Sequence, residues 1–158
     1  METTLQHITL QNFKLKSGKI LDINLSYQIF WPELFSAPVI LVNHALTGNS
    51  NVSGEKGWWR DLIGKEKIID TYQFTVLCFN IPGNGFDGNT IENYQDFTTS
   101  DIAKIFLEGL EFLKINNLHA IIGGSLGGAI GWEMLAIEPN LTKNFIPVAC
   151  DYQTSDWL

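Results

Sequence analysis

The chain has 158 residues, of which 45% are hydrophobic and 17% are charged, and its formal net charge is −7. This length and composition suit one globular domain with a sizeable core. The negative charge argues against nucleic acid or an anionic membrane surface as a partner, since both are bound through basic patches. No apolar run approaches the roughly 18 residues of a membrane span, and the N-terminus lacks a signal-peptide pattern. We therefore expect a soluble, cytoplasmic protein.

The first two predicted elements form a hairpin. Residues 5–15 and 20–30 alternate between apolar and polar side chains, which is typical of strands with one buried face. Ser17 and Gly18 lie between the two stretches and favour a tight turn. The sequence therefore predicts an antiparallel hairpin at the start of the chain.

Four later segments are short and almost continuously apolar: residues 39–42, 74–79, 119–122 and 145–149. Strands that are buried on both faces of a parallel sheet have this composition. Cys78 and Cys150 fall in or beside two of these runs, and their separation matches no metal-binding spacing. We expect both to be buried free thiols and predict no metal site.

Two helices are predicted between these strands. Apolar residues recur at helical spacing from Ile102 to Leu113, with residues 99–101 supplying cap and first-turn chemistry. A second helix should run from Leu126 to Ile137 and end before Pro139. This alternation of strands and helices predicts an α/β fold, with an antiparallel hairpin leading into a mostly parallel sheet that carries helices on both faces. We predict a single domain over residues 1–158.

The most informative motif is the sequence Gly-Gly-Ser-Leu-Gly-Gly at residues 123–128. It contains G-x-S-x-G between a predicted buried strand and a predicted helix, which is the context of a nucleophile elbow. The small residues let the strand and the helix pass closely, and Ser125 becomes the candidate nucleophile. The Leu126 amide, at the start of the helix, is a candidate oxyanion-hole donor.

Two other interpretations of this motif are weaker. A glycine-rich turn without chemistry could contain G-x-S-x-G by chance, but the strand and helix on either side favour the elbow. A phosphate-binding loop would require a Lys-Ser or Lys-Thr pair after its last glycine, and none follows here.

A second oxyanion donor is expected in the loop after the first parallel strand, at residues 43–48. His44 lies in this loop, where it could also be an ordinary hydrogen-bonded loop histidine. It is a poor candidate for the general base, because triads of this fold run serine, acid, histidine along the chain.

No histidine follows Ser125, since His7, His44 and His119 all precede it. Asp151 and Asp156 follow the serine, but an acid without a histidine has nothing to orient. Either the chain is a pseudoenzyme that lost its base, or it is the N-terminal half of a longer protein. The second explanation is favoured, because the sequence stops soon after a buried strand and would leave an apolar edge open.

Several stretches together resemble homoserine O-acetyltransferases, which have an α/β-hydrolase fold. The resemblance runs from about residue 39 to residue 149, and its most specific pieces are His-Ala-Leu-Thr-Gly at 44–48 and Gly-Trp-Trp at 57–59. Further matches are residues 61–64, 69–71, 76–80, Thr99, Asp101 and the elbow at 123–128.

The resemblance implies that Ser125 is the nucleophile and that the amides of Leu46 and Leu126 form the oxyanion hole. It implies acetyl transfer from acetyl-CoA to the hydroxyl of L-homoserine in methionine biosynthesis, with no bound cofactor and with a homodimer for the full-length protein. The triad Asp and His would lie outside this chain, so residues 1–158 alone should be inactive. Trp58 and Trp59 are interpreted as family markers that pack, rather than as site residues.

Two departures from the family pattern leave the substrates open. A turn with the sequence Ile-Pro-Gly-Asn-Gly at 81–85 replaces a longer segment, and Ala129-Ile130 stands where the family tends to have Met-Gln. A serine ester or thioester hydrolase of the same fold is therefore an alternative, and so is a non-catalytic binding protein of this fold.

Overall fold

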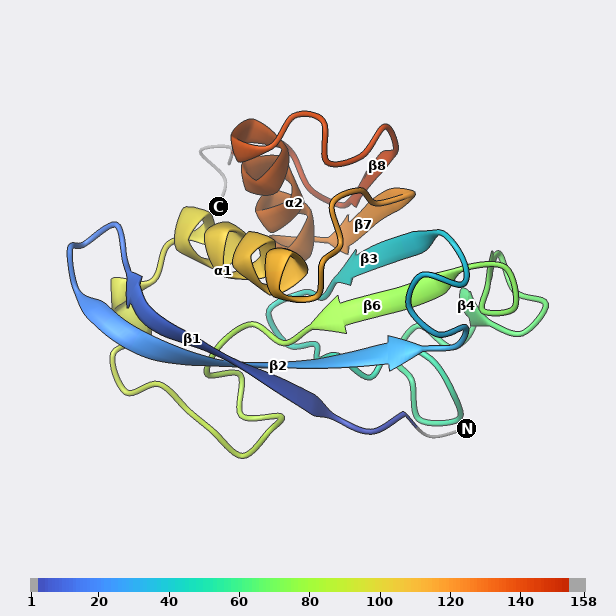
Figure 1. Cartoon of the computed structure of the whole chain (residues 1–158), viewed down its shortest axis with the longest axis horizontal. Helices are drawn as coiled ribbons and strands as arrows, with labels where there is room; N and C mark the ends of the chain where they lie inside the picture. The colour runs from blue at the N-terminus through green and yellow to red at the C-terminus, as the bar shows by residue number, and fades with distance from the viewer. Residues whose placement is uncertain (1–2, 154–158) are drawn as a thin grey trace.

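A six-stranded sheet forms the centre of the computed structural model, which describes residues 3–153 (Figure 1). Three neighbouring strands at one edge pair antiparallel, and the rest of the sheet is parallel. The strands, in order across the sheet, are β1 (Gln6–Lys14), β2 (Ile20–Phe30), β6 (Thr75–Phe79), β3 (Val39–Asn43), β7 (Ala120–Gly124) and β8 (Phe145–Val148). The predicted α/β class, with a hairpin leading into a mostly parallel sheet, is confirmed.

The hairpin of β1 and β2 turns where the sequence predicts. Gly18 has a φ of 89°, a conformation that glycine adopts without strain, and its amide donates to the Leu15 carbonyl. The pairing register runs from Gln6 opposite Tyr27 to Lys14 opposite Ile20. β2 then pairs with β6, which joins the hairpin to the parallel strands.

The central strands divide their side chains between two hydrophobic clusters, one on each face of the sheet. Leu41, Leu77 and Ile121 belong to the cluster on what we call the helix face. Their neighbours Ile40, Val76 and Ile122 belong to the cluster on the opposite face, which we call the loop face. The alternation follows from the two-residue period of a strand, and it confirms that these strands are buried on both sides.

Both described helices, α1 (Thr99–Phe112) and α2 (Leu126–Ile137), pack on the same face of the sheet (Figure 1). The prediction of helices on both faces is therefore wrong for the described residues. The connections β6–α1–β7 and β7–α2–β8 step in the same direction across the sheet, and right-handed crossovers then place both helices on one side. The observed bounds of α2 are those predicted.

The loop face is covered by the chain between β3 and β6 instead of by a helix. This segment contributes Val52, Ile63 and Ile69 to the cluster, with Trp58 and Trp59 packed against it. It contains a small two-stranded parallel sheet, β4 (Ile63–Gly64) and β5 (Ile69–Asp70), which the sequence pattern did not predict. A 3-10 helix, Tyr94–Asp96, was also not predicted.

Two expectations for the end of the chain are wrong: that the last strand is buried on both faces, and that Cys150 is buried. β8 pairs only with β7 among the described residues, and its side chains alternate between half-buried and exposed. It is therefore not buried on both faces, because an apolar composition alone does not distinguish an edge strand from a central one. Cys150, which follows β8, is half-buried, whereas Cys78 is fully buried in β6.

Asp101 belongs to a capping box at the start of α1, and it also bonds to the turn of the hairpin. Thr98, one residue before the predicted cap, is the N-cap, and its hydroxyl accepts from the Asp101 amide. The fully buried Asp101 carboxylate accepts from the Thr98 amide and hydroxyl and, on its other oxygen, from the Lys16 amide at 2.7 Å. Burial alone would raise the pKa of Asp101, but these hydrogen bonds outweigh it and hold the pKa below its usual value.

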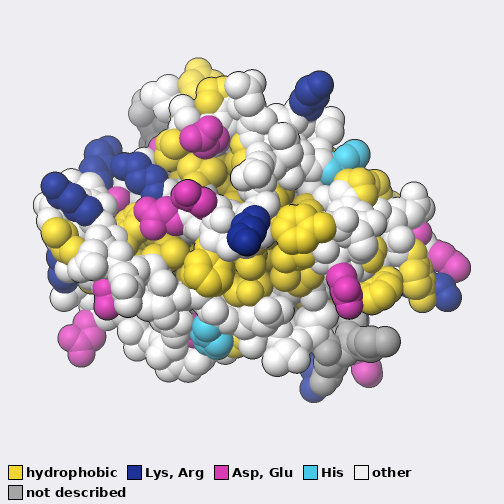
Figure 2. Space-filling model, viewed as in Figure 1, with side chains coloured by type: hydrophobic (Ala, Val, Ile, Leu, Met, Phe, Trp, Pro, Cys, Tyr) yellow, Lys and Arg dark blue, Asp and Glu magenta, His cyan; other side chains and the backbone are white. Residues whose placement is uncertain are grey.

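The surface is mixed in character. Figure 2 shows hydrophobic side chains across the middle of one face, with acidic and basic side chains around them. Neither α1 nor α2, the helices of residues 3–153, has the length and hydropathy required to span a bilayer.

Replacing Asp101 by Ala should lower the free energy of unfolding by about 2–4 kcal/mol, because the Lys16 and Thr98 amides lose a charged acceptor at a buried position. Urea denaturation measures the change. Asp96→Ala is the matched control, since Asp96 forms an exposed ion pair with Lys19 and its loss should cost under about 1 kcal/mol. Equal losses in the two variants would contradict the role given to Asp101.

Candidate active site

Ser125 lies at the sharp turn between β7 and α2, and its side chain is exposed. Its φ of 50° and ψ of −119° are unfavourable for a residue that carries a Cβ. The surrounding backbone maintains this conformation: the Ser125 amide donates to the Val148 carbonyl, and the Ser125 carbonyl accepts from the amides of Gly128 and Ala129. Strain of this kind at an exposed serine is a recurrent feature of functional sites.

Glycine is required here because three segments of backbone meet. A Cβ on Gly127 would lie 2.1 Å from the Asn43 carbonyl oxygen, and one on Gly123 would lie 2.4 Å from the carbonyl group of Gly127. A Cβ on Gly128 would lie 2.7 Å from the Cβ of Cys150. The first turn of α2 thus contacts the ends of β3 and β7 directly, as the elbow motif predicts.

The same close approach brings the two predicted oxyanion donors into one region. The chain that leaves β3 passes against Gly127 and then turns at residues 45–48, where the Gly48 amide donates to the Ala45 carbonyl. Leu46 lies in this turn, and its side chain is 71% exposed. Within residues 3–153, no acceptor for the Leu46 or Leu126 amide is found. Neither amide is therefore committed to an internal hydrogen bond, and the Leu126 amide also lies at the positive end of the α2 dipole.

His44 is a structural residue and not a free base. Its Nε2 accepts from the Ile81 amide at 3.0 Å, so its proton is on Nδ1, which donates to the Ala45 carbonyl at 2.7 Å. The side chain is fully buried, and burial lowers its pKa, with the hydrogen bond to Ala45 opposing part of that shift. With both nitrogens engaged, His44 cannot take the proton of Ser125.

The other titratable candidates do not complete a triad. His119 is exposed just before β7 begins, so the whole strand separates it from Ser125, and His7 is exposed on β1 at the far edge of the sheet. Asp151 is exposed after β8, where its carboxylate accepts from the Tyr152 amide, and Asp156 lies outside the described residues. Within residues 3–153 no histidine is hydrogen-bonded to Ser125, and no group of three His, Cys, Asp or Glu residues could hold a metal ion.

Trp59 is a neighbour of the elbow that the sequence interpretation missed. A Cβ on Gly124, the residue before Ser125, would lie 3.7 Å from Cζ2 of Trp59. The indole packs against the ring of Trp58 at an interplanar angle of 47°, and Trp58 Nε1 donates to the Asn49 carbonyl at 2.8 Å. The proximity of Trp59 and Gly124 could not be inferred from the sequence, because 65 residues separate them.

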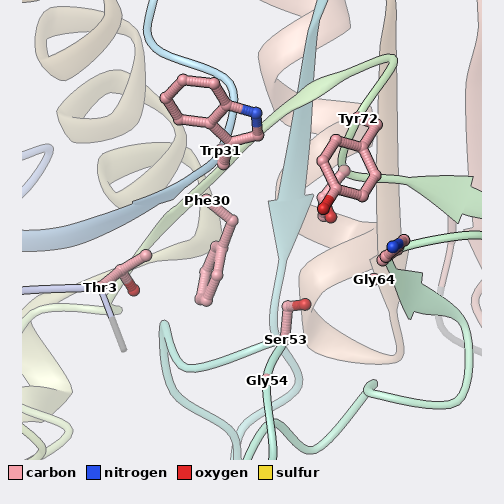
Figure 3. A pocket seen from close by; sticks show the side chains of 9 residues that line it. Thr3, Phe30, Trp31, Ser53, Gly54, Gly64 and Tyr72 are labelled. Atoms are coloured by element: carbon pink, nitrogen blue, oxygen red, sulfur yellow. The ribbon is translucent and has the colours of Figure 1, made fainter. Parts of the chain in front are cut away.

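A cleft of about 490 Å³ lies elsewhere on the loop side of the molecule (Figure 3). The rings of Phe30, Trp31 and Tyr72 surround it, with the Ser53 hydroxyl toward its interior. Phe30 pairs with Val76 near the start of β6, so the cleft is at the end of the parallel strands opposite Ser125. It is therefore not part of the candidate site around Ser125.

Comparison with known proteins gives a consistent result. Residues 38–155 match the model of the alpha/beta hydrolase fold family. A homoserine O-acetyltransferase of Corynebacterium diphtheriae is 32% identical over 98% of this chain. The crystal structure of homoserine O-acetyltransferase from Bacillus anthracis covers 99% of the chain with a TM-score of 0.84 and 25% identity. The crystal structure of esterase E22 covers 99% with a TM-score of 0.86 and 23% identity, a likeness of fold.

The chain spans about half of the length of these proteins or less. It covers 44% of the Corynebacterium diphtheriae protein, 49% of the Bacillus anthracis chain and 50% of the esterase E22 chain.

Replacing Gly127 by Ala should lower the free energy of unfolding by about 3 kcal/mol, because the new methyl group would overlap the Asn43 carbonyl oxygen and neither backbone can move freely. Gly124→Ala is the matched control, since its methyl group would only reach ordinary contact with Trp59 and should cost under about 1 kcal/mol. Chemical denaturation compares the two. A Gly127→Ala protein as stable as Gly124→Ala would contradict the close approach.

Acid should destabilise the fold through His44. Because burial lowers its pKa, the unfolded chain binds the proton first as the pH falls below about 6.5. The free energy of unfolding should then decrease with falling pH, by at most about 1.4 kcal/mol per pH unit from this residue. Denaturation at several pH values should show a shallower acid slope for His44→Gln than for the parent. Identical slopes in the two proteins would refute the assignment.

Proposed function

Because the chain belongs to the alpha/beta hydrolase fold family, we propose that Ser125 is the nucleophile of a serine acyltransferase. The proposed reaction moves an acetyl group from acetyl-CoA to the hydroxyl of L-homoserine, a step of methionine biosynthesis in the cytoplasm. One observation carries the proposal: an exposed serine lies in a strained turn at the start of a helix, beside a loop with an available amide. The 32% identity to a homoserine O-acetyltransferase supports this choice of acyl acceptor.

The site suits acyl transfer in two steps. In the first, the Ser125 Oγ bonds to the thioester carbonyl carbon, a base takes the serine proton, and the CoA thiol leaves with a proton. In the second, the base takes the proton of the homoserine hydroxyl as its oxygen bonds to that carbon. The bond between the carbon and Ser125 Oγ then breaks, the proton passes to Oγ, and O-acetylhomoserine leaves. The amides of Leu46 and Leu126 would donate to the carbonyl oxygen as it becomes negative in each step, a contribution typically worth several kcal/mol per donor.

The base and the acid that orients it are proposed to lie in protein outside residues 1–158. His44 is already engaged by Ile81 and Ala45, and His7 and His119 lie away from the elbow. The complete enzyme would be a homodimer with acetyl-CoA as co-substrate and no bound cofactor, in which residues 1–158 belong to one α/β-hydrolase-type domain.

A serine ester or thioester hydrolase is the second candidate. The turn after β6 favours it, because Gly83 and Gly85 both have positive φ there, and a Pro-Gly-x-Gly turn of this type is common in plain hydrolases. A hydrolase would use the same Ser125 chemistry, with water in place of the homoserine hydroxyl. A non-catalytic protein is the third, since Ser125 has no base within the described residues.

Incubating the full-length gene product with acetyl-CoA should release free CoA much faster when L-homoserine is present. Ser125→Ala should abolish that release, and residues 1–158 alone should show none, because a serine without a base is a weak nucleophile. Thiol titration of CoA and mass spectrometry of the acetylated product measure the reaction. Equal rates with and without homoserine would favour the hydrolase, and full activity of Ser125→Ala would exclude both enzymes.

A further inference from the structure

Buried polar side chains form a network beneath the loop that carries Leu46. They come from β2, from the end of that loop and from the residue after β6, and each is less than one-tenth exposed: Ser26, Gln28, Ser50 and Asn80. Buried polar groups cost free energy unless they are hydrogen-bonded. A network in which they are fully paired favours a single arrangement of the segments that it joins.

Asn80 is the centre of this network, and all of its hydrogen-bonding capacity is used. Its Oδ1 accepts from the Ser50 amide at 2.7 Å and from Asn84 Nδ2 at 3.1 Å. Its Nδ2 donates to the hydroxyls of Ser26 and Ser50, at 2.9 and 3.0 Å. The Ser50 hydroxyl in turn donates to Gln28 Oε1 at 2.7 Å.

The loop of residues 44–50 is thereby attached at both ends to consecutive residues. At its start, His44 Nε2 accepts from the Ile81 amide, and at its end Ser50 bonds to Asn80. Asn84 adds a longer contact of 3.5 Å to the Gly48 carbonyl. Leu46 lies between these attachments, and its exposed side chain supplies little packing that could hold the loop.

We propose that Asn80 is a positioning residue for the oxyanion hole: by holding Ser50, it fixes the loop of residues 44–50 and with it the Leu46 amide. This inference rests on the proposed function, in which that amide stabilises the acyl-transfer transition state. Such donors act only when they lie about 2.7–3.1 Å from the developing oxyanion. A loop free to move by an ångström would lose most of this effect.

The first test measures loop order and catalysis in Asn80→Ala of the full-length gene product. Hydrogen exchange of the Gly48 amide, which donates to the Ala45 carbonyl within the loop, should become at least roughly tenfold faster, since the loop opens locally. The kcat for hydrolysis of a chromogenic acetyl ester should fall roughly 10- to 100-fold, with little change in KM, because the lost interaction is made in the transition state.

Thr75→Val is the matched control for lost stability. Thr75 lies at the other end of β6, is fully buried, and donates its hydroxyl to the carbonyls of Pro32 and Glu33. Its replacement should lower the melting temperature but leave exchange of the loop and kcat unchanged. Equal effects of the two substitutions on kcat would show that Asn80 acts through general stability and would overturn the proposal.

Asn84→Ala keeps the proposal testable if Asn80→Ala does not fold. Asn84 is only half-buried, and its loss removes bonds to Asn80 Oδ1 and to Gly48. Hydrogen exchange of the loop and kcat should change in the same directions as in Asn80→Ala, but by smaller factors.

Unchanged exchange in both variants would overturn the positioning role. Faster exchange with unchanged kcat would also overturn it, by showing that the Leu46 amide is not the donor. Failure of the transferase proposal alone would appear separately, as an ester-cleavage rate that homoserine does not change.

Discussion

The close approach of the first turn of α2 to the end of β3 is the constraint on which the site depends. Because Gly127 has no side chain, its backbone can touch the carbonyls of Asn43 and His44. That contact brings the end of one strand and the chain that follows it against the first turn of the helix that Ser125 precedes. The relative positions of Ser125 and the two candidate donors therefore follow from backbone packing. Any side chain at position 127 would push the helix and the strand end apart.

Much of this arrangement could be predicted from local sequence. The alternating residues of the hairpin, the apolar runs of β3, β6 and β7, and the elbow between β7 and α2 each carry a pattern within a few residues. The bounds of α2 were predicted correctly because glycine-rich residues precede it and Pro139 follows it. The start of α1 was displaced by one residue, since Thr98 and Thr99 are both plausible caps.

What the sequence did not reveal depends on contacts between distant residues. Both helices lie on one face because β6, β7 and β8 follow one another in a single direction across the sheet, and strand order is not encoded in any local pattern. The proximity of Trp59 to Gly124 and the bonds of Asn80 to Ser26 and Ser50 likewise join segments far apart in the chain. Serine and asparagine are ordinary loop residues in sequence, and only burial identifies them as a network.

The sheet separates two hydrophobic cores, and each core holds different segments of the chain. The cluster on the helix face joins the hairpin, α1 and α2, whereas the cluster on the loop face holds the segment with Trp58 and Trp59. Few side chains are shared between them, so substitutions on the loop face leave the larger core intact. A lineage with this architecture can therefore vary the loop segment, which reaches Gly124 through Trp59, while the strand and helix that hold Ser125 keep their stability.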